Sequence, residues 1–550
     1  MDSERFNIAQ YLPETAAKFP LQKAVICPGA RINGRRSYLS VNFQQLNAEC
    51  DRFAHGLFNS GLTRGMKTLL MVKPSIEFIA LTFAVFKIGA IPVLIDPGMG
   101  IKRLLECIRN VEPDALIGIP QAHAARILFP ACFKKTRLNV VVNSNLSFLG
   151  LPLEKISPEC SESFPISDTT KASPAAILFT TGSTGPAKGV LYEHGMFDAQ
   201  VQMLHDLYDF QPGEVDLAGL PVFALFDAAL AMTCVVPDMD PSHPALVNPA
   251  NIVEAIRDNG VTTSFGSPAI WNRVSEYCLD HNIVLPTLRR VLMAGAPVPG
   301  SLVEKFKKVI PLGDIHTPYG ATESLPASSI SGSKLISDTL EKSRQGFGTC
   351  VGMPAPNVEI RVIRISESPI QEWISSLILP PSEVGEIVIK GPQVTKEYYG
   401  NPAETELSKI RQGGEFWHRI GDVGYLDQQG RLWFCGRKSH RVELKDRILF
   451  TVPCEAIYNQ HPNVSRTALV GIEIDGETCP VIVVEPKTGF FPEDRQAVKQ
   501  FRRELFELGK KYEHTRNIKI FLFHKSFPVD IRHNAKIFRE KLSVWARKKL

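Results

Sequence analysis

The chain has 550 residues, of which 44% are apolar and 22% are charged, and its formal net charge is only +5. Because one hydrophobic core rarely organises so long a chain, this length predicts a large body and at least one smaller domain. The 11 cysteines form no CxxC pair and no cluster with histidine, so neither a disulfide framework nor a zinc site is predicted, and a cytoplasmic location is expected.

Two features of the N-terminal region argue against export and membrane insertion. Residues 1–5 are acidic and contain no apolar run, so no secretory signal is expected. The most hydrophobic stretch, residues 68–97, is interrupted by Lys73, Glu77 and Lys87 and therefore lacks the apolar length that spans a bilayer. We expect a soluble protein with no membrane span.

The first part of the chain has an alternating pattern of elements. In residues 43–90, helical spacing of apolar residues alternates with short β-rich runs such as 68–72, and the alternation returns in residues 261–295. Alternating strands and helices predict parallel α/β sheets with crossover helices. A Ser/Pro-rich stretch, residues 143–174, follows the first of these units.

A glycine-rich segment comes next, where residues 177–189 read ILFTTGSTGPAKG. Glycines let backbone N–H groups approach an anion, hydroxyls add donors and a lysine adds charge, so this loop is predicted to bind phosphate. It departs from the P-loop pattern G-x-x-x-x-G-K-[ST], because Ala187 precedes the lysine and Gly189 follows it. The alternative is an ordinary flexible connection. The candidate phosphate-binding residues are Thr180, Thr181, Gly182, Ser183, Thr184, Gly185 and Lys188.

Beyond residue 351 the pattern changes to short alternating strands, such as 358–362 and 385–390, which predict a small antiparallel or β-barrel-like section. The last part is basic, with 23 Lys and Arg against 14 Asp and Glu in residues 437–550. We therefore expect a large N-terminal domain, residues 1–436, and a smaller α+β domain, residues 437–550. No aromatic-basic RNA signature accompanies the charge, so a solvated surface or closure over a nucleotide is expected, with no nucleic acid partner.

Four further segments carry residues that suit nucleotide chemistry. They read MAGAP at 293–297, YGATES at 319–324, IGDVGY at 420–425 and DIRHNAKIFR at 530–539. Each has an ordinary structural alternative, since residues 422–424 could form a hairpin turn, Gly320 could begin a helix, and Lys536 could lie on a basic surface helix. Their occurrence together and in this order favours one shared site over coincidence.

Together the five segments resemble the core motifs of the adenylate-forming superfamily, which includes acyl-CoA synthetases, peptide-synthetase adenylation domains and luciferases. The resemblance runs from about Phe6 to Leu542 and implies ATP and Mg²⁺ as cofactors. It places the segment of Gly295, Ala296 and Pro297 against adenine. A carboxylate is a suitable ligand for Mg²⁺ and can also accept from both ribose hydroxyls.

The resemblance also implies roles for the remaining motif residues. Tyr319 and Gly320 belong to the nucleotide site, Thr322 would meet phosphate, and Glu323 would hold Mg²⁺. Asp422 would bind the ribose, Arg437 would mark the interdomain hinge, and Lys536 would face the reacting carboxylate and the α-phosphate. The implied first step is attack of a substrate carboxylate on the α-phosphorus of ATP, with Lys536, Thr322 and Glu323 as the catalytic residues.

The segment after the hinge bears on the second step. Acyl-CoA ligases of the superfamily carry K-x-x-G-x-x-I-x-P-x-E there, beside which pantetheine enters. In this chain Pro453 and Glu455 are present, but no glycine lies between Arg437 and Ile457. This departure argues against thioester formation.

Residues 223–227, 236–241 and 328–348, with the hinge, resemble a narrower branch, the β-lactone synthetases of bacterial long-chain olefin biosynthesis. The implied substrate is a long-chain 2-alkyl-3-hydroxy acid, whose 3-hydroxyl attacks the adenylated carboxyl, expels AMP and closes a β-lactone. The alternatives are a long-chain fatty acyl-CoA ligase and a non-catalytic relative that binds nucleotide. A thiolase-like enzyme, a reductase and a lactone decarboxylase are the partners that the resemblance implies.

Some features stay open at this level. His194, His316 and His440 lie in or near motifs, yet a structural role is the simpler interpretation for each, so no general base is assigned. Phe223, Phe226 and Trp271 are candidates for an acyl pocket or for plain core. Chain length, stereochemistry and oligomeric state do not follow from the residues.

Overall fold

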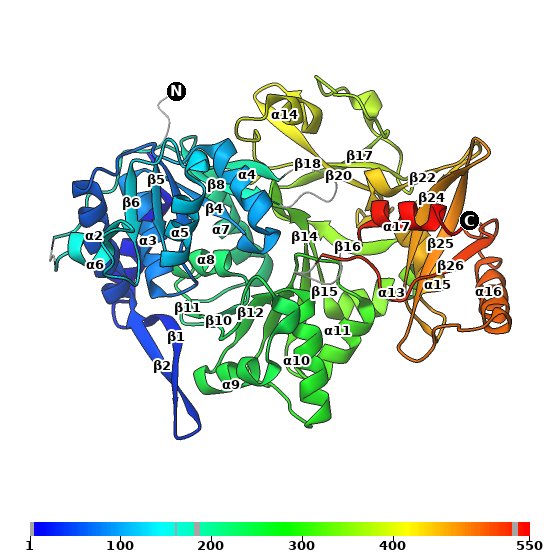
Figure 1. Cartoon of the computed structure of the whole chain (residues 1–550), viewed down its shortest axis with the longest axis horizontal. Helices are drawn as coiled ribbons and strands as arrows, with labels where there is room; N and C mark the ends of the chain where they lie inside the picture. The colour runs from blue at the N-terminus through cyan, green and yellow to red at the C-terminus, as the bar shows by residue number, and fades with distance from the viewer. Residues whose placement is uncertain (1–4, 160–161, 181–186, 531–536) are drawn as a thin grey trace.

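The computed structural model describes residues 5–159, 162–180, 187–530 and 537–550. Two large sheets and a smaller C-terminal α+β unit make up the molecule (Figure 1). The first sheet lies on the left of Figure 1, the second runs through the centre, and the C-terminal unit, in orange and red, lies on the right. The mixed α/β and α+β architecture is the one that the sequence predicts.

The first sheet has seven strands in the order β7-β6-β5-β3-β4-β8-β9 and is parallel except at β8–β9. Strand side chains point alternately to two cores, so that Leu70 packs on one face and Leu69 on the other. The strands are β3 (Lys67–Met71), β4 (Ile91–Ile95), β5 (Ala115–Gly118), β6 (Leu138–Val141), β7 (Leu151–Pro152), β8 (Pro174–Thr180) and β9 (Lys188–Glu193).

Helices cover both faces of this sheet. One face carries α2 and α3, and α4 packs on the other. The helices of this part are α1 (Tyr11–Lys18), α2 (Phe43–Asn59), α3 (Ile76–Ile88), α4 (Ile101–Val111), α5 (Pro120–Leu128), α6 (Leu153–Ile156), α7 (His194–Tyr208) and α8 (Ala224–Ala229).

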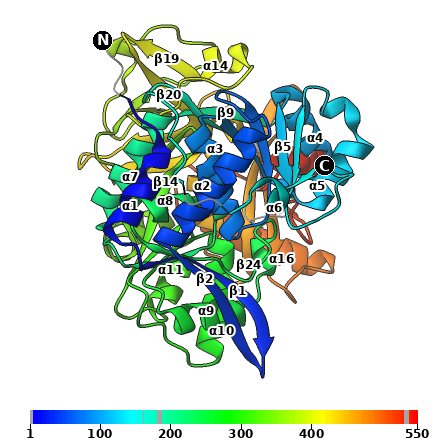
Figure 2. The same cartoon turned by 90° about the vertical axis from the view of Figure 1, so that its left-hand side faces the viewer.

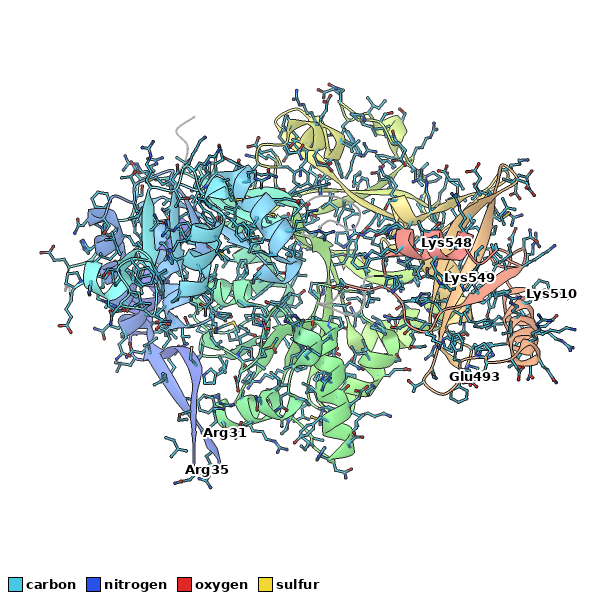
Figure 3. All side chains as sticks on the ribbon, in the orientation of Figure 1. Arg31, Arg35, Glu493, Lys510, Lys548 and Lys549 are labelled. Carbon is cyan, nitrogen blue, oxygen red and sulfur yellow. The ribbon has the colours of Figure 1, made fainter. Side chains whose placement is uncertain are left out.

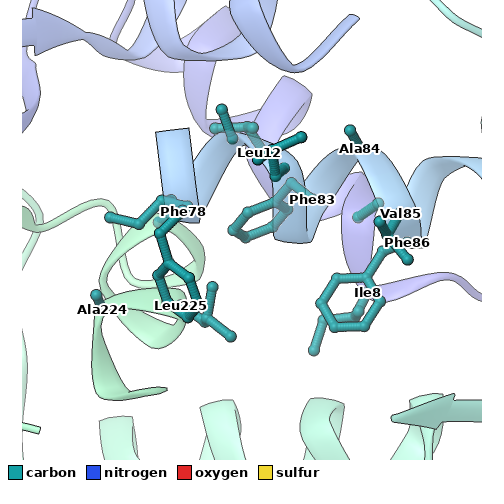
Figure 4. Close-up of a cluster of buried hydrophobic side chains, with 14 of the residues drawn as sticks. Ile8, Leu12, Phe78, Phe83, Ala84, Val85, Phe86, Ala224 and Leu225 are labelled. Carbon is teal, nitrogen blue, oxygen red and sulfur yellow. The ribbon is translucent and has the colours of Figure 1, made fainter. Parts of the chain in front are cut away.

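Helix α3 explains the most hydrophobic stretch of the sequence. It begins after Ser75, whose side chain accepts from the Phe78 N–H, and ends at Gly89, which has a positive φ of 77°. In Figure 4 its Phe83 lies near Leu12 of α1, Phe78 near Leu225 of α8, and Phe86 near Ile8, just before α1. The buried Lys87 ammonium lies 2.6 Å from Asp51 Oδ1. Within the part of the chain that the structure describes, none of the helices combines the length and apolar composition that crossing a bilayer requires.

The second sheet has 14 strands in the order β17-β18-β20-β21-β16-β15-β14-β13-β12-β10-β11-β1-β2, with β19 beside β20. It is parallel from β1 to β14 and antiparallel from β14 to β17. The antiparallel section thus begins at Ser324, whereas the sequence pattern places it only beyond residue 351. It belongs to the same sheet as the parallel half.

The strands of the second sheet are β1 (Lys23–Ile32), β2 (Arg35–Asn42), β10 (Val215–Ala218), β11 (Thr233–Val235), β12 (Thr263–Gly266), β13 (Arg290–Met293), β14 (Asp314–Ala321), β15 (Ser324–Ser331), β16 (Thr349–Pro354), β17 (Glu359–Ile363), β18 (Gly385–Lys390), β19 (Lys409–Gln412), β20 (Glu415–Leu426) and β21 (Leu432–Arg437). Its helices are α9 (Pro249–Asn259), α10 (Pro268–Asp280), α11 (Gly300–Lys307), α12 (Gly332–Lys334), α13 (Leu340–Arg344) and α14 (Pro402–Ser408).

The C-terminal unit has its own sheet, in the order β24-β25-β26, and a two-stranded ribbon, β22-β23. Its two cores draw only on residues from Val442 onward. Exposed lysines such as Lys510, Lys548 and Lys549 point into solvent (Figure 3). The division between residues 436 and 437 stays a prediction. The elements are β22 (Val442–Glu443), β23 (Ile448–Leu449), α15 (Thr451–Tyr458), β24 (Val464–Ile474), β25 (Glu477–Pro486), α16 (Arg495–Gly509), β26 (Ile520–Phe523) and α17 (Arg539–Arg547).

Candidate active site

A cavity of about 2610 Å³ lies where the carboxyl ends of the two parallel sheets meet the C-terminal unit. Its lining includes polar motif residues, among them Glu323 and Asp422, as well as apolar residues of the strand ends. The carboxyl ends of parallel strands are the usual place for a ligand in an open α/β sheet. The cavity is therefore the candidate site.

The glycine loop joins two antiparallel strands, because β8 ends at Thr180 and β9 begins at Lys188, its register partner. In a P-loop a helix follows the glycines. Here a strand follows, so the loop differs from a P-loop in structure as well as in sequence. Thr181, Gly182, Ser183, Thr184 and Gly185 lie outside the described residues.

Lys188 lines the cavity next to Glu404 and Tyr398, which lie outside every predicted motif. Its ammonium is hydrogen bonded to Glu404 Oε1 and lies 5.2 Å from the centre of the Tyr398 ring. Glu404 also lines the cavity. A triphosphate bound beside Lys188 therefore has to compete with a carboxylate for its charge.

Glu323 lies between β14 and β15 and is only 8% exposed. The Tyr398 hydroxyl donates to Glu323 Oε1 over 2.6 Å, and burial followed by the nearby Glu323 charge raises the pKa of Tyr398, which therefore stays protonated. The Thr395 N–H donates to the Glu323 carbonyl over 2.9 Å. The neighbouring Thr322 carbonyl accepts from the buried Tyr192 hydroxyl.

Behind this acid lies a buried lysine, Lys409. Its ammonium donates to the Thr395 carbonyl and lies 3.5 Å from Thr395 Oγ1. Burial lowers the pKa of Lys409 to about 7, although the nearby Glu323 charge acts in the opposite direction. His418, its register partner on β20, has a pKa well below its usual range, chiefly because it is buried. Neither residue was identifiable from the sequence.

The oxygen donors around Glu323 determine whether Mg²⁺ can bind there. Mg²⁺ usually takes one or two carboxylates together with substrate phosphates and water. Glu323 supplies one carboxylate that faces the cavity and is oriented by Tyr398. Among the described residues no cluster of three His, Cys, Asp or Glu could hold a metal by itself. The donor set therefore fits an ion that is completed by phosphate oxygens.

Asp422 lies on β20, directly opposite Arg437 on β21. The Tyr319 hydroxyl donates to Asp422 Oδ2 over 2.7 Å, and Arg437 Nη1 lies 2.9 Å from Oδ1 in an ion pair. Burial raises the pKa of Asp422, and the Arg437 charge opposes that shift. The Asp422 charge in turn raises the pKa of Arg437. Apart from this ion pair, the buried Oδ1 accepts no hydrogen bond from the described residues. An acceptor of this kind suits a ribose hydroxyl.

The turn after β13 also lines the cavity. Gly295 has a φ of 87°, a conformation that favours glycine, and it turns the chain into Ala296 and Pro297. Tyr319 and Gly320 line the same cavity. The structure thus brings the predicted adenine, ribose and metal-binding residues to one cavity, although they come from three separate segments.

Aromatic residues in and near α8 line another part of the cavity. Phe223 stacks on Phe265 with ring centroids 3.4 Å apart, and Phe226 lies 5.5 Å from Phe223. All three line the cavity. Trp271 does not; it packs against Phe306 in the core of the second sheet.

Below these rings lie two buried acids, Asp216 and Asp227. They line a small hollow of about 20 Å³ together with Phe223 and Phe226. Burial raises the pKa of both, that of Asp227 to about 7. Asp227 Oδ2 accepts no hydrogen bond from the described residues.

The three candidate histidines have different surroundings. His194 is buried, its Nδ1 accepts from the Ile8 N–H over 3.2 Å, and burial lowers its pKa to about 4. His316 packs against Tyr208, and burial lowers its pKa as well. Of the three, His440 lines the cavity and the other two do not. The surroundings of His194 and His316 are therefore those of packed residues with a structural role.

The C-terminal motif brackets the cavity. Asp530 and Ile537 through Arg539 line it, whereas Lys536 lies outside the described residues. Arg539 Nη2 donates to Glu455 Oε1 and Oε2 over 2.8 and 2.7 Å, and the buried Glu455 also accepts from the Leu469 N–H over 2.9 Å. This ion pair ties the end of the motif to α15.

Comparisons with known proteins agree with this geometry. Residues 12–399 match the family model described as AMP-binding enzyme. The chain is 44% identical to an olefin beta-lactone synthetase from Xanthomonas campestris pv. campestris, over 98% of this chain and 97% of the relative. It is 43% identical to an olefin beta-lactone synthetase from Stenotrophomonas maltophilia, over 99% and 98%. The amide bond synthetase McbA from Marinactinospora thermotolerans has the same fold, with a TM-score of 0.80 at 21% identity over 98% and 99% of the two chains.

Proposed function

This chain belongs to the AMP-binding enzyme family, and we propose that it is a β-lactone synthetase that acts on a long-chain 2-alkyl-3-hydroxy acid. The observation that carries the proposal is one cavity whose lining includes both the nucleotide motifs and the apolar residues Phe223, Phe226 and Phe265. Its similarity to two olefin beta-lactone synthetases over nearly the whole chain supports the same product.

In the first half-reaction, a carboxylate oxygen of the substrate attacks the α-phosphorus of ATP. The bond from that phosphorus to the bridging oxygen breaks, and the products are an acyl-adenylate and pyrophosphate. Asp422 accepts from the ribose, and the turn at Gly295 lies along adenine. Glu323, held by Tyr398, would bind Mg²⁺, which offsets phosphate charge when bound. We assign Lys536 and Thr322 to the charge that develops on the α-phosphoryl group.

In the second half-reaction, the substrate's own 3-hydroxyl oxygen attacks the acyl carbon. The acyl carbon–oxygen bond to AMP breaks, the hydroxyl proton passes to water or to the departing AMP phosphate, and a four-membered lactone closes. The nucleophile and the electrophile share one molecule, so positioning replaces a second substrate. Ring strain opposes closure, and the cavity therefore has to hold the chain folded.

The ribbon after the hinge supports this choice over thioester formation. Counting back from Pro453 and Glu455, the glycine of the ligase pattern falls at Ile448 and its lysine at Lys445. Ile448 lies on β23 and is 41% exposed, so its side chain occupies space that a glycine would leave open. A long-chain acyl-CoA ligase is the second candidate, and this substitution argues against it.

The proposal is tested by incubating the enzyme with ATP, Mg²⁺ and a long-chain 2-alkyl-3-hydroxy acid, with and without CoA. We expect AMP and β-lactone without CoA, and no thioester when CoA is added. A product that forms only with CoA would refute the proposal. Lys536→Ala should abolish pyrophosphate release, whereas Lys510→Ala, an exposed lysine of the same unit, should leave it unchanged.

Three further assignments belong to the proposal. Residues 437–550 act as a mobile lid that closes over the nucleotide. The enzyme works in the cytoplasm, in agreement with its 11 cysteines and their lack of a disulfide pattern. A thiolase-like enzyme and a reductase supply the hydroxy acid, and a decarboxylase consumes the lactone. Co-purification from the native host would test these partners.

A further inference from the structure

One face of the first sheet's edge carries an unusual group of exposed hydrophobic side chains. The last turn of α5 and the loop that leads into β7 expose six large apolar residues, each at least 41% accessible. Leu128 and Phe148 are the most exposed, at 72% and 73%. We call this group the apolar patch; its residues are Ile127, Leu128, Phe129, Leu146, Phe148 and Leu151.

The two segments of the apolar patch belong to one surface. Arg126 Nη2, in α5, donates to the Leu149 carbonyl over 2.9 Å, in the middle of the loop. Leu151 pairs with Val140 at the edge of the sheet, since β7 is the terminal strand. Helix α5 lies at the periphery of the molecule in Figure 2. Groups of exposed large apolar residues on a monomeric protein often mark a binding surface.

The segment that carries the apolar patch is basic, with the acidic residues Glu112, Asp114 and Glu154 just outside it. Residues 115–153 contain four basic residues, Arg126, Lys134, Lys135 and Arg137, and no Asp or Glu. Lys134 and Arg137 are exposed, and Lys135 lies 2.5 Å from Glu112 Oε2. Apolar side chains surrounded by basic ones match the interface of an anionic bilayer, where the former enter the acyl boundary and the latter contact headgroups.

The apolar patch also adjoins an opening of the cavity. Gln121, Ala122 and Ala125, on the same helix, line the cavity, and so do Ile101 and Arg103 of α4. Gln121, Ile101 and Arg103 are exposed, so the cavity reaches solvent beside these residues. Ala125 and Leu128 are one helical turn apart, about 4.5 Å along the helix axis. A surface that binds the patch therefore lies next to a mouth of the cavity.

We propose that the apolar patch docks this protein onto an anionic lipid bilayer surface, with the mouth of the cavity beside α5 turned toward the lipid. If the substrate is the two-chain acid of the proposed function, docking lets it pass from lipid to cavity with little exposure to water. The docking itself is independent of which product the enzyme makes.

The test is co-sedimentation of the full chain with vesicles of phosphatidylglycerol and phosphatidylcholine, compared with phosphatidylcholine alone, at physiological salt. The wild type should bind the anionic vesicles more strongly. Leu128→Ser with Phe148→Ser should lower the partition coefficient at least about tenfold, because two large apolar anchors are lost. Lys134→Gln with Arg137→Gln should weaken binding to anionic vesicles alone.

The matched control is Leu312→Ser, which removes a leucine that is 80% exposed on the second sheet's side of the molecule. It should bind vesicles as the wild type does. Thermal unfolding and adenylation of a short, soluble 3-hydroxy acid should be the same in all variants, which separates lost docking from lost folding or activity. Wild-type protein that ignores vesicles, or patch variants that bind as Leu312→Ser does, would overturn the proposal. Self-association lost in the patch variants, without vesicle binding, would assign the patch to a protein partner instead.

Discussion

Replacing Tyr398 with phenylalanine should change the dependence on Mg²⁺ more than any other property of the enzyme. The substitution removes one hydroxyl, which donates to Glu323 Oε1 over 2.6 Å, and both side chains are buried. It is the one hydrogen bond that described side chains make to this carboxylate. The ring itself remains, so that its packing against Lys188 is kept.

The magnitude follows from the charge on the acceptor. A hydrogen bond to a charged group contributes about 1.5–3 kcal/mol, and every 1.36 kcal/mol corresponds to about a tenfold change. Partners that orient a metal-binding carboxylate typically account for about 10- to 100-fold in metal affinity or activity. We therefore expect the Mg²⁺ concentration that gives half-maximal pyrophosphate release to rise about 10- to 100-fold in Tyr398→Phe.

The assay is pyrophosphate release at saturating ATP and substrate, with free Mg²⁺ varied. Tyr399→Phe is the matched control, because the adjacent hydroxyl accepts from Lys67 over 3.0 Å and does not contact Glu323. Its Mg²⁺ dependence should equal that of the wild type. An unchanged Mg²⁺ dependence in Tyr398→Phe, with Glu323→Gln equally unaffected, would refute Glu323 as the metal ligand.

Three other substitutions test separate parts of the structure. Asp422→Asn should raise the KM for ATP about tenfold or more, because a charged acceptor for ribose and the partner of Arg437 are lost; an unchanged KM would contradict the assignment. Asp227 has a folded-state pKa of about 7, above the ordinary 3.8, so the wild type should lose stability as the pH rises from about 4 to about 7. In thermal unfolding, Asp227→Asn should lose less stability over the same pH range. Lys409 has a folded-state pKa of about 7, below the ordinary 10.5, so the wild type should gain stability as the pH rises from 7 to 9. If stability rises equally steeply with pH in Lys409→Met, the lowered pKa of Lys409 is contradicted.

The sequence predicts the candidate site where its residues lie in one short segment. Tyr319, Gly320, Thr322 and Glu323 are adjacent in the chain, and a pattern of adjacent residues can be recognised without knowing the fold. Tyr398 contacts Glu323 across 75 residues, and Glu404 contacts Lys188 across 216. Such pairs depend on how the antiparallel section folds back on the first sheet, which no local pattern encodes.

The fold shows the same limit. Alternating strands and helices predict parallel sheets, because each unit is built from neighbouring residues. The start of the antiparallel section at Ser324 was not identifiable, since β15 carries small polar residues and no clear alternation. Trp271 shows the converse problem. An aromatic residue in an apolar helix suits a pocket or a core equally well, and the packing against Phe306 puts it in the core.

The connection to the C-terminal unit bears on which second step the molecule can use. Lys438 lies directly after β21, and its ammonium is 3.1 Å from Glu386 Oε1. Glu386 is fully buried and also binds Arg419, so separating the units would cost the Lys438 contact while leaving that inner pair intact. Admitting a second substrate between the units after adenylation would require this contact to break at that stage. Lactone closure brings no second substrate, so the same arrangement of domains can serve both half-reactions. The glycine position of the ligase pattern can then be an isoleucine, Ile448, without loss of function.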